Sequence, residues 1–211
     1  MILILPSKST QLIISLIIVH KQRLLFRDGG STKFFFYLLL KQCLKSFVVF
    51  SLNYINKIES IYFTIHGESH FYNQVSLVIQ ETLRLYPVAP VMVRQTSKRV
   101  NIGNIDILAG TQLYMSIISV HHDTQIWGED ALEFNPMRFT KSQKHSSSYF
   151  PFGFGPNYCV GQNLALIEMK IVLAMILQRY SFTVSPIYVH GPILVMSVSP
   201  QYGMQIVFRR L

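Results

Sequence analysis

One cysteine in a glycine-rich loop is the feature that most constrains the fold of this 211-residue chain. Cys159 lies in residues 152–161, which also hold three glycines and a proline, and an apolar helical run follows directly. Loop N–H groups and a helix N-terminus both favour a thiolate there. Glycine also lets the backbone approach a flat, bulky ligand. The loop therefore suits a cysteine that ligates haem iron; a buried cysteine without a ligand is the alternative.

An acid–base pair lies upstream of this loop. Glu81 and Arg84 fall in residues 74–86, whose mixed apolar pattern predicts a mostly buried helix. Side chains three residues apart share a helix face and can form an ion pair. Pro87 and Pro90 then end the helix and force an extended exit. An exposed ion pair on a helix surface is the alternative interpretation, because Glu-x-x-Arg is common.

Three separated motifs, taken in order, resemble the cytochrome P450 family. The cysteine loop matches that family's pattern Phe-x-x-Gly-x-Arg-x-Cys-x-Gly at four positions, Phe152, Gly155, Cys159 and Gly161. At the arginine position this chain has Asn157 instead. Residues 133–139 look like the family segment that supplies a second arginine, here Arg138. By this resemblance Glu81, Arg84 and Arg138 form a buried charge network that locks the haem-side core.

The resemblance covers residues 71–211, the C-terminal haem-binding portion of the family. It implies a mainly α-helical fold with small β-sheets (α+β): the Glu-x-x-Arg helix, small sheets, a meander, the cysteine loop and a haem-backing helix. Residues 1–70 hold no recognisable motif. We expect them to be an unassigned segment foreign to the fold, from translated non-coding sequence or a misassembled gene. They contain no match to the family's oxygen-activating helix, whose acid–alcohol pair delivers protons to bound oxygen.

Short strands and turns are predicted after the first helix. Strand-like runs occur at residues 91–94, 100–102 and 105–108, and residues 112–119 then lead into His121. By resemblance this region forms a small sheet followed by a meander. A β-rich tail that ends at residues 205–208 looks most like the plant P450 clan whose members oxidise hormones and terpenoids.

Arg94 and His121 carry two further assignments. Arg94 matches the family arginine that contacts a haem propionate; an ordinary cation at a strand edge is the alternative. His121 is interpreted as structural. A metal pair of His121 and His122 is not expected, because neighbours on an extended strand point to opposite faces. His66 and His70 have helical chelating spacing, but no further ligands lie nearby in the sequence.

The run at residues 162–179 predicts a helix that is apolar nearly all round. Such a helix belongs in a protein interior, and by resemblance it backs the haem. Its length of eighteen residues, together with Glu168 and Lys170, makes it a poor membrane span. The N-terminal apolar runs at residues 2–5 and 12–19 are shorter still. The sequence therefore predicts no clear anchor.

The charge and the cysteine content of the chain indicate which kinds of partner and compartment suit it. The net charge is +9, but the basic residues are scattered singly, so we expect no nucleic-acid partner. A diffuse basic balance suits an acidic electron-donor protein or an anionic membrane surface. Cys43 and Cys159 form no disulfide framework. An iron-bound Cys159 cannot also be bridged, which fits a reducing compartment.

The resemblance implies an oxidoreductase, a monooxygenase with haem (heme, iron protoporphyrin IX). Such an enzyme inserts one oxygen of O2 into a small apolar organic substrate. Electrons come from a flavoprotein reductase, so NADPH acts only indirectly. Membrane association at the cytosolic face of the endoplasmic reticulum is also implied. The alternatives are a non-catalytic P450 remnant without stable haem and a small membrane-associated protein. We expect this fragment to be inactive alone, and its sequence assigns no catalytic residue and no particular substrate.

Overall fold

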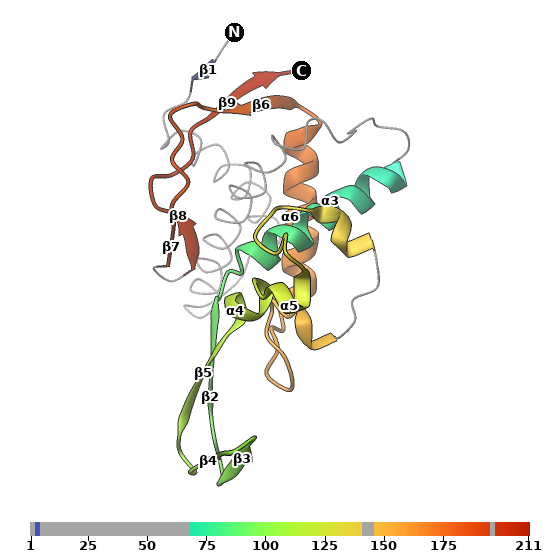
Figure 1. The fold of residues 1–211 in the computed structure, drawn as a ribbon. Coiled ribbons are helices and arrows are strands. Elements are labelled where there is room, and N and C mark those ends of the chain that lie inside the picture. Colours follow the sequence, from blue (N-terminus) through green and yellow to red (C-terminus); the bar gives the residue numbers. More distant parts are fainter. Residues whose placement is uncertain (1–2, 5–67, 141–145, 195–196) are drawn as a thin grey trace, which may run out of the picture.

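Two crossing helices organise the structure, a computed structural model that describes residues 3–4, 68–140, 146–194 and 197–211 (Figure 1). Helix α3 (Glu68–Leu85) packs against helix α6 (Gln162–Leu177). Their contact forms the centre of the core, with the C-terminal sheet closing one end. The buried core residues are Val75, Val78, Ile79, Leu83, Met169, Val172, Leu173, Ile176, Phe182, Met204 and Ile206.

Helix α3 confirms the helix predicted at residues 74–86 and begins six residues earlier. One further turn bond, from Tyr86 N–H to Thr82 O (2.8 Å), closes its C-terminal end. Pro87 follows and cannot continue the helical hydrogen bonding. Four apolar side chains of α3, namely Val75, Val78, Ile79 and Leu83, are at most 4% exposed. Burying a side chain of this kind contributes roughly 1.5–3 kcal/mol.

Helix α6 ends at Leu177, two residues earlier than predicted, and is not buried all round. One face carries Met169, Val172, Leu173 and Ile176, all at most 7% exposed. The other face carries Leu164, Ile167 and Ile171, which are 39%, 56% and 39% exposed. This second face is an exposed apolar surface, because no described element covers it.

A β-hairpin extends away from the helices. Strand β2 (Val91–Gln95) pairs with β5 (Gln112–Ser116), and β3 (Val100–Ile102) pairs with β4 (Ile105–Ile107) at the tip (Figure 1). The turn between β3 and β4 needs Gly103, whose φ of 60° lies in the left-handed region.

Residues 112–119, in the region expected to hold short strands and turns, divide after Ser116 between a strand and a helix. The Ser116 hydroxyl accepts a hydrogen bond from Ser119 N–H (3.2 Å) and so caps a short helix, α4 (Ile117–His121). Helix α5 (Thr124–Trp127) and the 3-10 turns η1 (Pro136–Thr140) and η2 (Ser146–Ser148) follow. His121 therefore ends a helix and does not lie on a strand.

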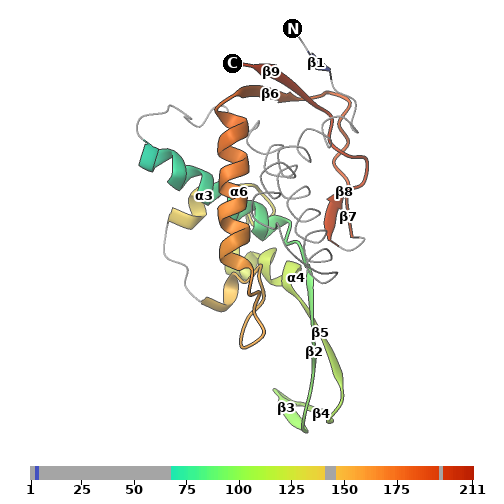
Figure 2. The ribbon, with the colours of Figure 1, turned by 180° about the vertical axis from the view of Figure 1, so that it is seen from behind.

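The C-terminal residues form two small antiparallel sheets (Figure 2). Strand β6 (Tyr180–Val184) pairs with β9 (Ile206–Arg210), which also pairs with β1 (Leu3–Ile4). Strand β7 (Pro192–Leu194) pairs with β8 (Val198–Pro200). These elements give the α+β fold that the motifs predicted. Among the described helices, none has the length and apolarity to cross a membrane.

Candidate functional site

The cysteine loop folds back on itself. Cys159 N–H donates to Phe152 O (2.9 Å), and Tyr158 N–H donates to Gly155 O (3.2 Å). Gly153 and Gly155 have φ angles of 83° and 81°. Residues that carry a Cβ rarely adopt φ angles in this left-handed region. Glycine at these two positions therefore allows the backbone of the loop to turn back.

The loop presents Cys159 as a free, exposed thiol next to the first turn of α6. Gly161 is the residue that precedes this helix. The exposed apolar side chains of the loop are Phe154 (54%), Tyr158 (60%) and Val160 (89%). A helix N-terminus stabilises a thiolate, and an apolar surface around it suits a flat apolar ligand. The arrangement offers a sulfur ligand on an open, apolar face.

Arg94 connects the hairpin to this loop. Its guanidinium donates from Nη2 to Phe154 O (3.0 Å), and the side chain is half-buried in β2. A Cβ built at Gly153 would lie 3.8 Å from the Met92 sulfur, on the same face of β2 as Arg94. Arginine carries five N–H donors, and this hydrogen bond uses one of them. The remaining donors suit a carboxylate of a ligand bound at the loop.

Asn157 is exposed and neutral where the family pattern has a second cation. The cation that contacts the described cysteine loop is Arg94, and it comes from strand β2.

The charge network predicted from sequence comes together in the structure. Glu81 accepts two hydrogen bonds from Arg84, Nε to Oε2 and Nη2 to Oε1, each 2.8 Å long. Arg138 Nε donates to Glu81 Oε1 (3.0 Å), as does the backbone N–H of Asn135 (2.9 Å). The side chains of Glu81 and Arg84 are 0% exposed and that of Arg138 is 10% exposed. The pair is therefore buried and not a surface ion pair.

Backbone carbonyls use further donors of Arg84. Nη1 donates to His121 O and Ala131 O (both 2.6 Å), and Nη2 donates to Glu133 O (3.3 Å). The guanidinium carbon lies 5.0 Å from the centroid of the Trp127 ring, within cation–π range. Because its charge and donors are paired, Arg84 is tolerated in the interior and ties α3 to residues 121–133.

Arg138 extends the network to the surface. Its Nη1 donates to Trp127 O (3.1 Å), and its Nη2 donates to the carboxylate of Asp130 (3.0 Å). The hydrogen bond from Arg138 holds the pKa of Asp130 below its usual range.

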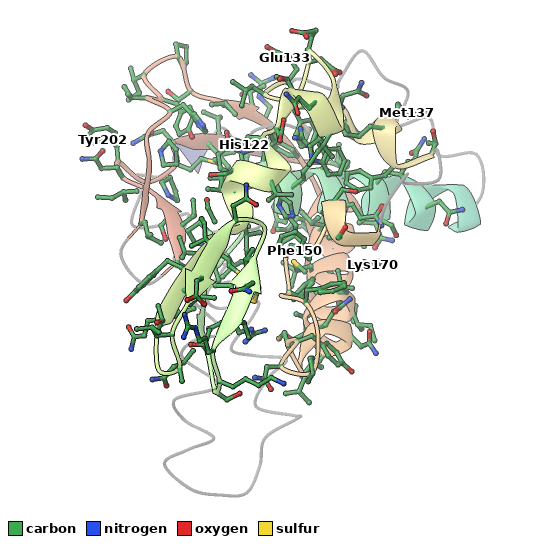
Figure 3. All side chains as sticks on the ribbon, turned by 60° about the horizontal axis from the view of Figure 1, so that its bottom comes forward. His122, Glu133, Met137, Phe150, Lys170 and Tyr202 are labelled. Atoms are coloured by element: carbon green, nitrogen blue, oxygen red, sulfur yellow. The ribbon has the colours of Figure 1, made fainter. Side chains whose placement is uncertain are left out.

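His121 joins this network to the cysteine loop. Its Nε2 accepts a hydrogen bond from Phe150 N–H (3.1 Å), and its ring stacks on Tyr149 at 5.5 Å between centroids. Tyr149 in turn donates to Gln80 O (3.1 Å) on α3. Figure 3 shows Phe150 in the segment that leads into the loop. The sequence indicated a structural role for His121 but did not indicate one for Tyr149. The one feature of Tyr149 that the sequence offers is its position just before the cysteine loop.

Burial determines the protonation states of His121, His122 and Tyr149. Loss of solvation lowers the pKa of His121 to about 4, so its ring is neutral at pH 7 and Nε2 can accept the bond from Phe150. Burial also raises the pKa of the Tyr149 hydroxyl, which stays protonated as a donor. Burial lowers the pKa of the adjacent His122 too, whose Nε2–H donates to Leu85 O (3.0 Å).

We expect stability to fall as the pH drops from about 6.5 towards 4, because His121 is then protonated in the unfolded chain but resists protonation when folded. A pKa of about 4 in the fold against 6.5 outside corresponds to about 3 kcal/mol lost over this window. Urea unfolding at a series of pH values measures the slope. His121→Gln, which does not titrate, should flatten it; an unchanged slope in this variant would contradict the assignment.

Other metal sites receive no support. Among the described residues, no group of three or more His, Cys, Asp or Glu side chains could hold a metal ion. Cys43, His66 and the side chain of His70 lie outside the part that the structure describes.

Comparisons with known proteins identify the family of the chain. The family model described as Cytochrome P450 matches residues 74–207, which contain α3 from residue 74 onward, the hairpin, the charge network and the cysteine loop. Cytochrome P450 72A397 of Kalopanax septemlobus is 45% identical over 141 residues, covering 65% of this chain and 27% of the relative. Cytochrome P450 734A5 of Oryza sativa subsp. japonica is 44% identical over 142 residues, 65% of this chain and 26% of the relative.

A relative whose name states an oxidation is similar over the same span. The 11-oxo-beta-amyrin 30-oxidase of Glycyrrhiza uralensis is 45% identical over 141 residues, 65% of this chain and 27% of the relative. The chain spans about a quarter of the length of the curated relatives that it matches. With more than half of its residues matched by the family model, this chain belongs to the cytochrome P450 family.

Proposed function

We propose that Cys159 is the axial thiolate ligand of a haem, and that residues 71–211 are the haem-thiolate portion of a monooxygenase. The observation that carries this proposal is the free, exposed Cys159 thiol at the N-terminal end of α6. Titration of the purified chain with ferric haem tests it. Saturation at about one haem per chain is expected, and the absence of saturable binding would contradict the proposal.

The residues around Cys159 fit this group. A soft thiolate suits iron, and Gly155 has open space around the position that a Cβ would take. Phe154, Tyr158 and Val160 supply apolar contact, while Arg94 has donors for a propionate. When bound, haem supplies the iron chemistry by which the family activates O2. The chain itself supplies the thiolate. Arg94 holds the cysteine loop against strand β2, and Glu81 holds α3 against the segment that contains Asn135 and Arg138.

Asn157→Arg is expected to tighten haem retention. A charge-assisted hydrogen bond to a propionate contributes about 1.5–3 kcal/mol, which neutral asparagine does not match. Transfer of haem to an acceptor protein should therefore slow about tenfold or more. Asn157→Gln is the matched control and should leave the rate unchanged. Equal rates for the arginine variant and the unmodified chain would show that position 157 does not contact the propionate.

The activity that we propose for this haem-thiolate portion to serve is insertion of one oxygen into a small apolar organic substrate. Electrons would come from a flavoprotein NADPH reductase, for which the net charge of +9 favours an acidic docking surface. The name 11-oxo-beta-amyrin 30-oxidase supports an apolar substrate class by similarity. We propose the cytosolic face of the endoplasmic reticulum membrane as its location, on the support of the same family membership.

The second candidate is a non-catalytic remnant. It is favoured by the exposed apolar face of α6. Catalysis needs a dry pocket and a positioned proton relay, and residues 1–70 match no such relay in sequence. We therefore expect no turnover from the 211-residue chain even with a reductase. Substrate-dependent NADPH consumption with product formation would overturn this expectation.

A further inference from the structure

His121 lies where helix α4 meets the segment that leads into the cysteine loop. It is the last residue of α4, and its side chain is 0% exposed. Its ring stacks on Tyr149 and meets the ring of Phe150 edge-on, at 5.4 Å between centroids. The backbone of His121 is itself fixed, because its carbonyl accepts from Arg84 Nη1 (2.6 Å). Two successive residues before the loop therefore pack on one anchored imidazole.

Hydrogen bonds connect this imidazole to the backbone of Cys159. Nε2 of His121 accepts from Phe150 N–H (3.1 Å). The carbonyl of Phe150 accepts from Gly153 N–H (3.0 Å), which closes a turn at the start of the loop. Within that turn, Phe152 O accepts from Cys159 N–H (2.9 Å). The imidazole thus holds the turn to which the backbone of the cysteine is bonded.

We propose that His121 is a positioning residue for Cys159, which it holds in place through the turn at residues 150–153. Its importance for haem ligation rests on the proposed function, whereas the contact between His121 and the loop does not depend on haem. Arg94 provides a comparable contact from strand β2, through Phe154 O (3.0 Å). Loss of the imidazole acceptor would leave a part-buried N–H without its partner, which is costly. The turn would then be free to shift, and the thiol with it.

Neutral imidazole is the form that makes this contact. A backbone N–H can only donate, so Nε2 of His121 must be the unprotonated nitrogen, whereas imidazolium has two donors and no acceptor. Loss of solvation is the largest effect that lowers the pKa of His121; the charges of Arg84 and His122 add to it, and the backbone of Arg84 opposes it. Tyr149, which packs against the ring, stays protonated and neutral. We therefore expect acid to release the loop at this point.

Hydrogen–deuterium exchange of the 211-residue chain, measured by mass spectrometry without haem, tests the contact. His121→Leu removes the acceptor, so the protection factors of amides in residues 150–159 should fall about tenfold or more. His121→Gln keeps an acceptor oxygen and should retain most of the protection. His122→Leu is the matched control, because it removes the neighbouring ring, which bonds to Leu85 O (3.0 Å). It should leave residues 150–159 unchanged.

Haem loading of the same variants tests the consequence for the ligand. The share of thiolate-type spectrum should fall about tenfold in His121→Leu and be retained in His121→Gln, as expected for a tenfold change in an equilibrium. An undiminished thiolate-type spectrum in His121→Leu would overturn the positioning role. If the unmodified chain itself shows no such spectrum, the proposed haem site fails, and the exchange experiment still decides whether His121 positions the loop.

Equal protection of residues 150–159 in His121→Leu and in the unmodified chain would also overturn the inference. So would an equal fall in helix α3, because that would show a loss of global stability. Should His121→Leu fail to fold, acid titration decides. Protection of residues 150–159 should be lost in the unmodified chain as the pH falls through about 4, the pKa of His121, and be retained in His121→Gln. Parallel loss in both chains would contradict the inference.

Discussion

Replacing Glu81 with alanine is expected to lower the free energy of unfolding by about 3–5 kcal/mol. The change removes the carboxylate that pairs with Arg84 and Arg138 and leaves the guanidinium of Arg84, which is 0% exposed, without its counter-charge. The loss approaches the whole stability of many domains. Urea unfolding followed by circular dichroism measures it, and Glu81→Gln, which keeps an acceptor oxygen, should lose less.

The chain offers a matched control for this prediction. Arg99 and Asp106 also form an ion pair, on the hairpin tip, where their side chains are 70% and 43% exposed. Solvent screens such pairs, so Asp106→Ala should change the free energy of unfolding by less than about 1 kcal/mol. Equal losses for Glu81→Ala and Asp106→Ala would show that burial of the network does not determine its contribution.

Cys159→Ser is expected to abolish thiolate-type haem binding. Serine keeps the shape of the side chain but replaces a soft sulfur ligand by a poor oxygen ligand for haem iron. Optical and electron paramagnetic resonance spectra of the haem-loaded variants report the ligand. Cys43→Ser is the control and should retain the spectrum of the unmodified chain. A thiolate-type spectrum in Cys159→Ser would mean that another sulfur binds the iron.

The parts of the fold that sequence predicted are those with a local signature. Residues 74–86 carry helical periodicity and a proline stop, and α3 ends where Pro87 requires. The Glu81–Arg84 pair follows from helix geometry, but its burial followed only from the family resemblance. Arg138, more than fifty residues away from Glu81 in sequence, was likewise placed by motif order and not by spacing.

The remaining features depend on tertiary contacts that leave no mark in the residue pattern. The carbonyls of His121 and Ala131 accept from Arg84, yet every residue carries a carbonyl, so the sequence does not single them out. The hydroxyl of Ser116 caps α4, a short helix that the strands and turns expected after Pro87 did not indicate. An all-apolar run predicts burial without stating what provides the cover, and no described element covers the second face of α6.

The reduced carbon monoxide difference spectrum of the purified chain is the most direct test of the central claim, that Cys159 holds haem as a thiolate. We expect a band at the position diagnostic of thiolate-ligated haem, present in the unmodified chain and absent in Cys159→Ser. Soluble, folded chain that has been given haem and shows no such band would contradict the claim and would identify the chain as a P450 remnant that does not bind haem.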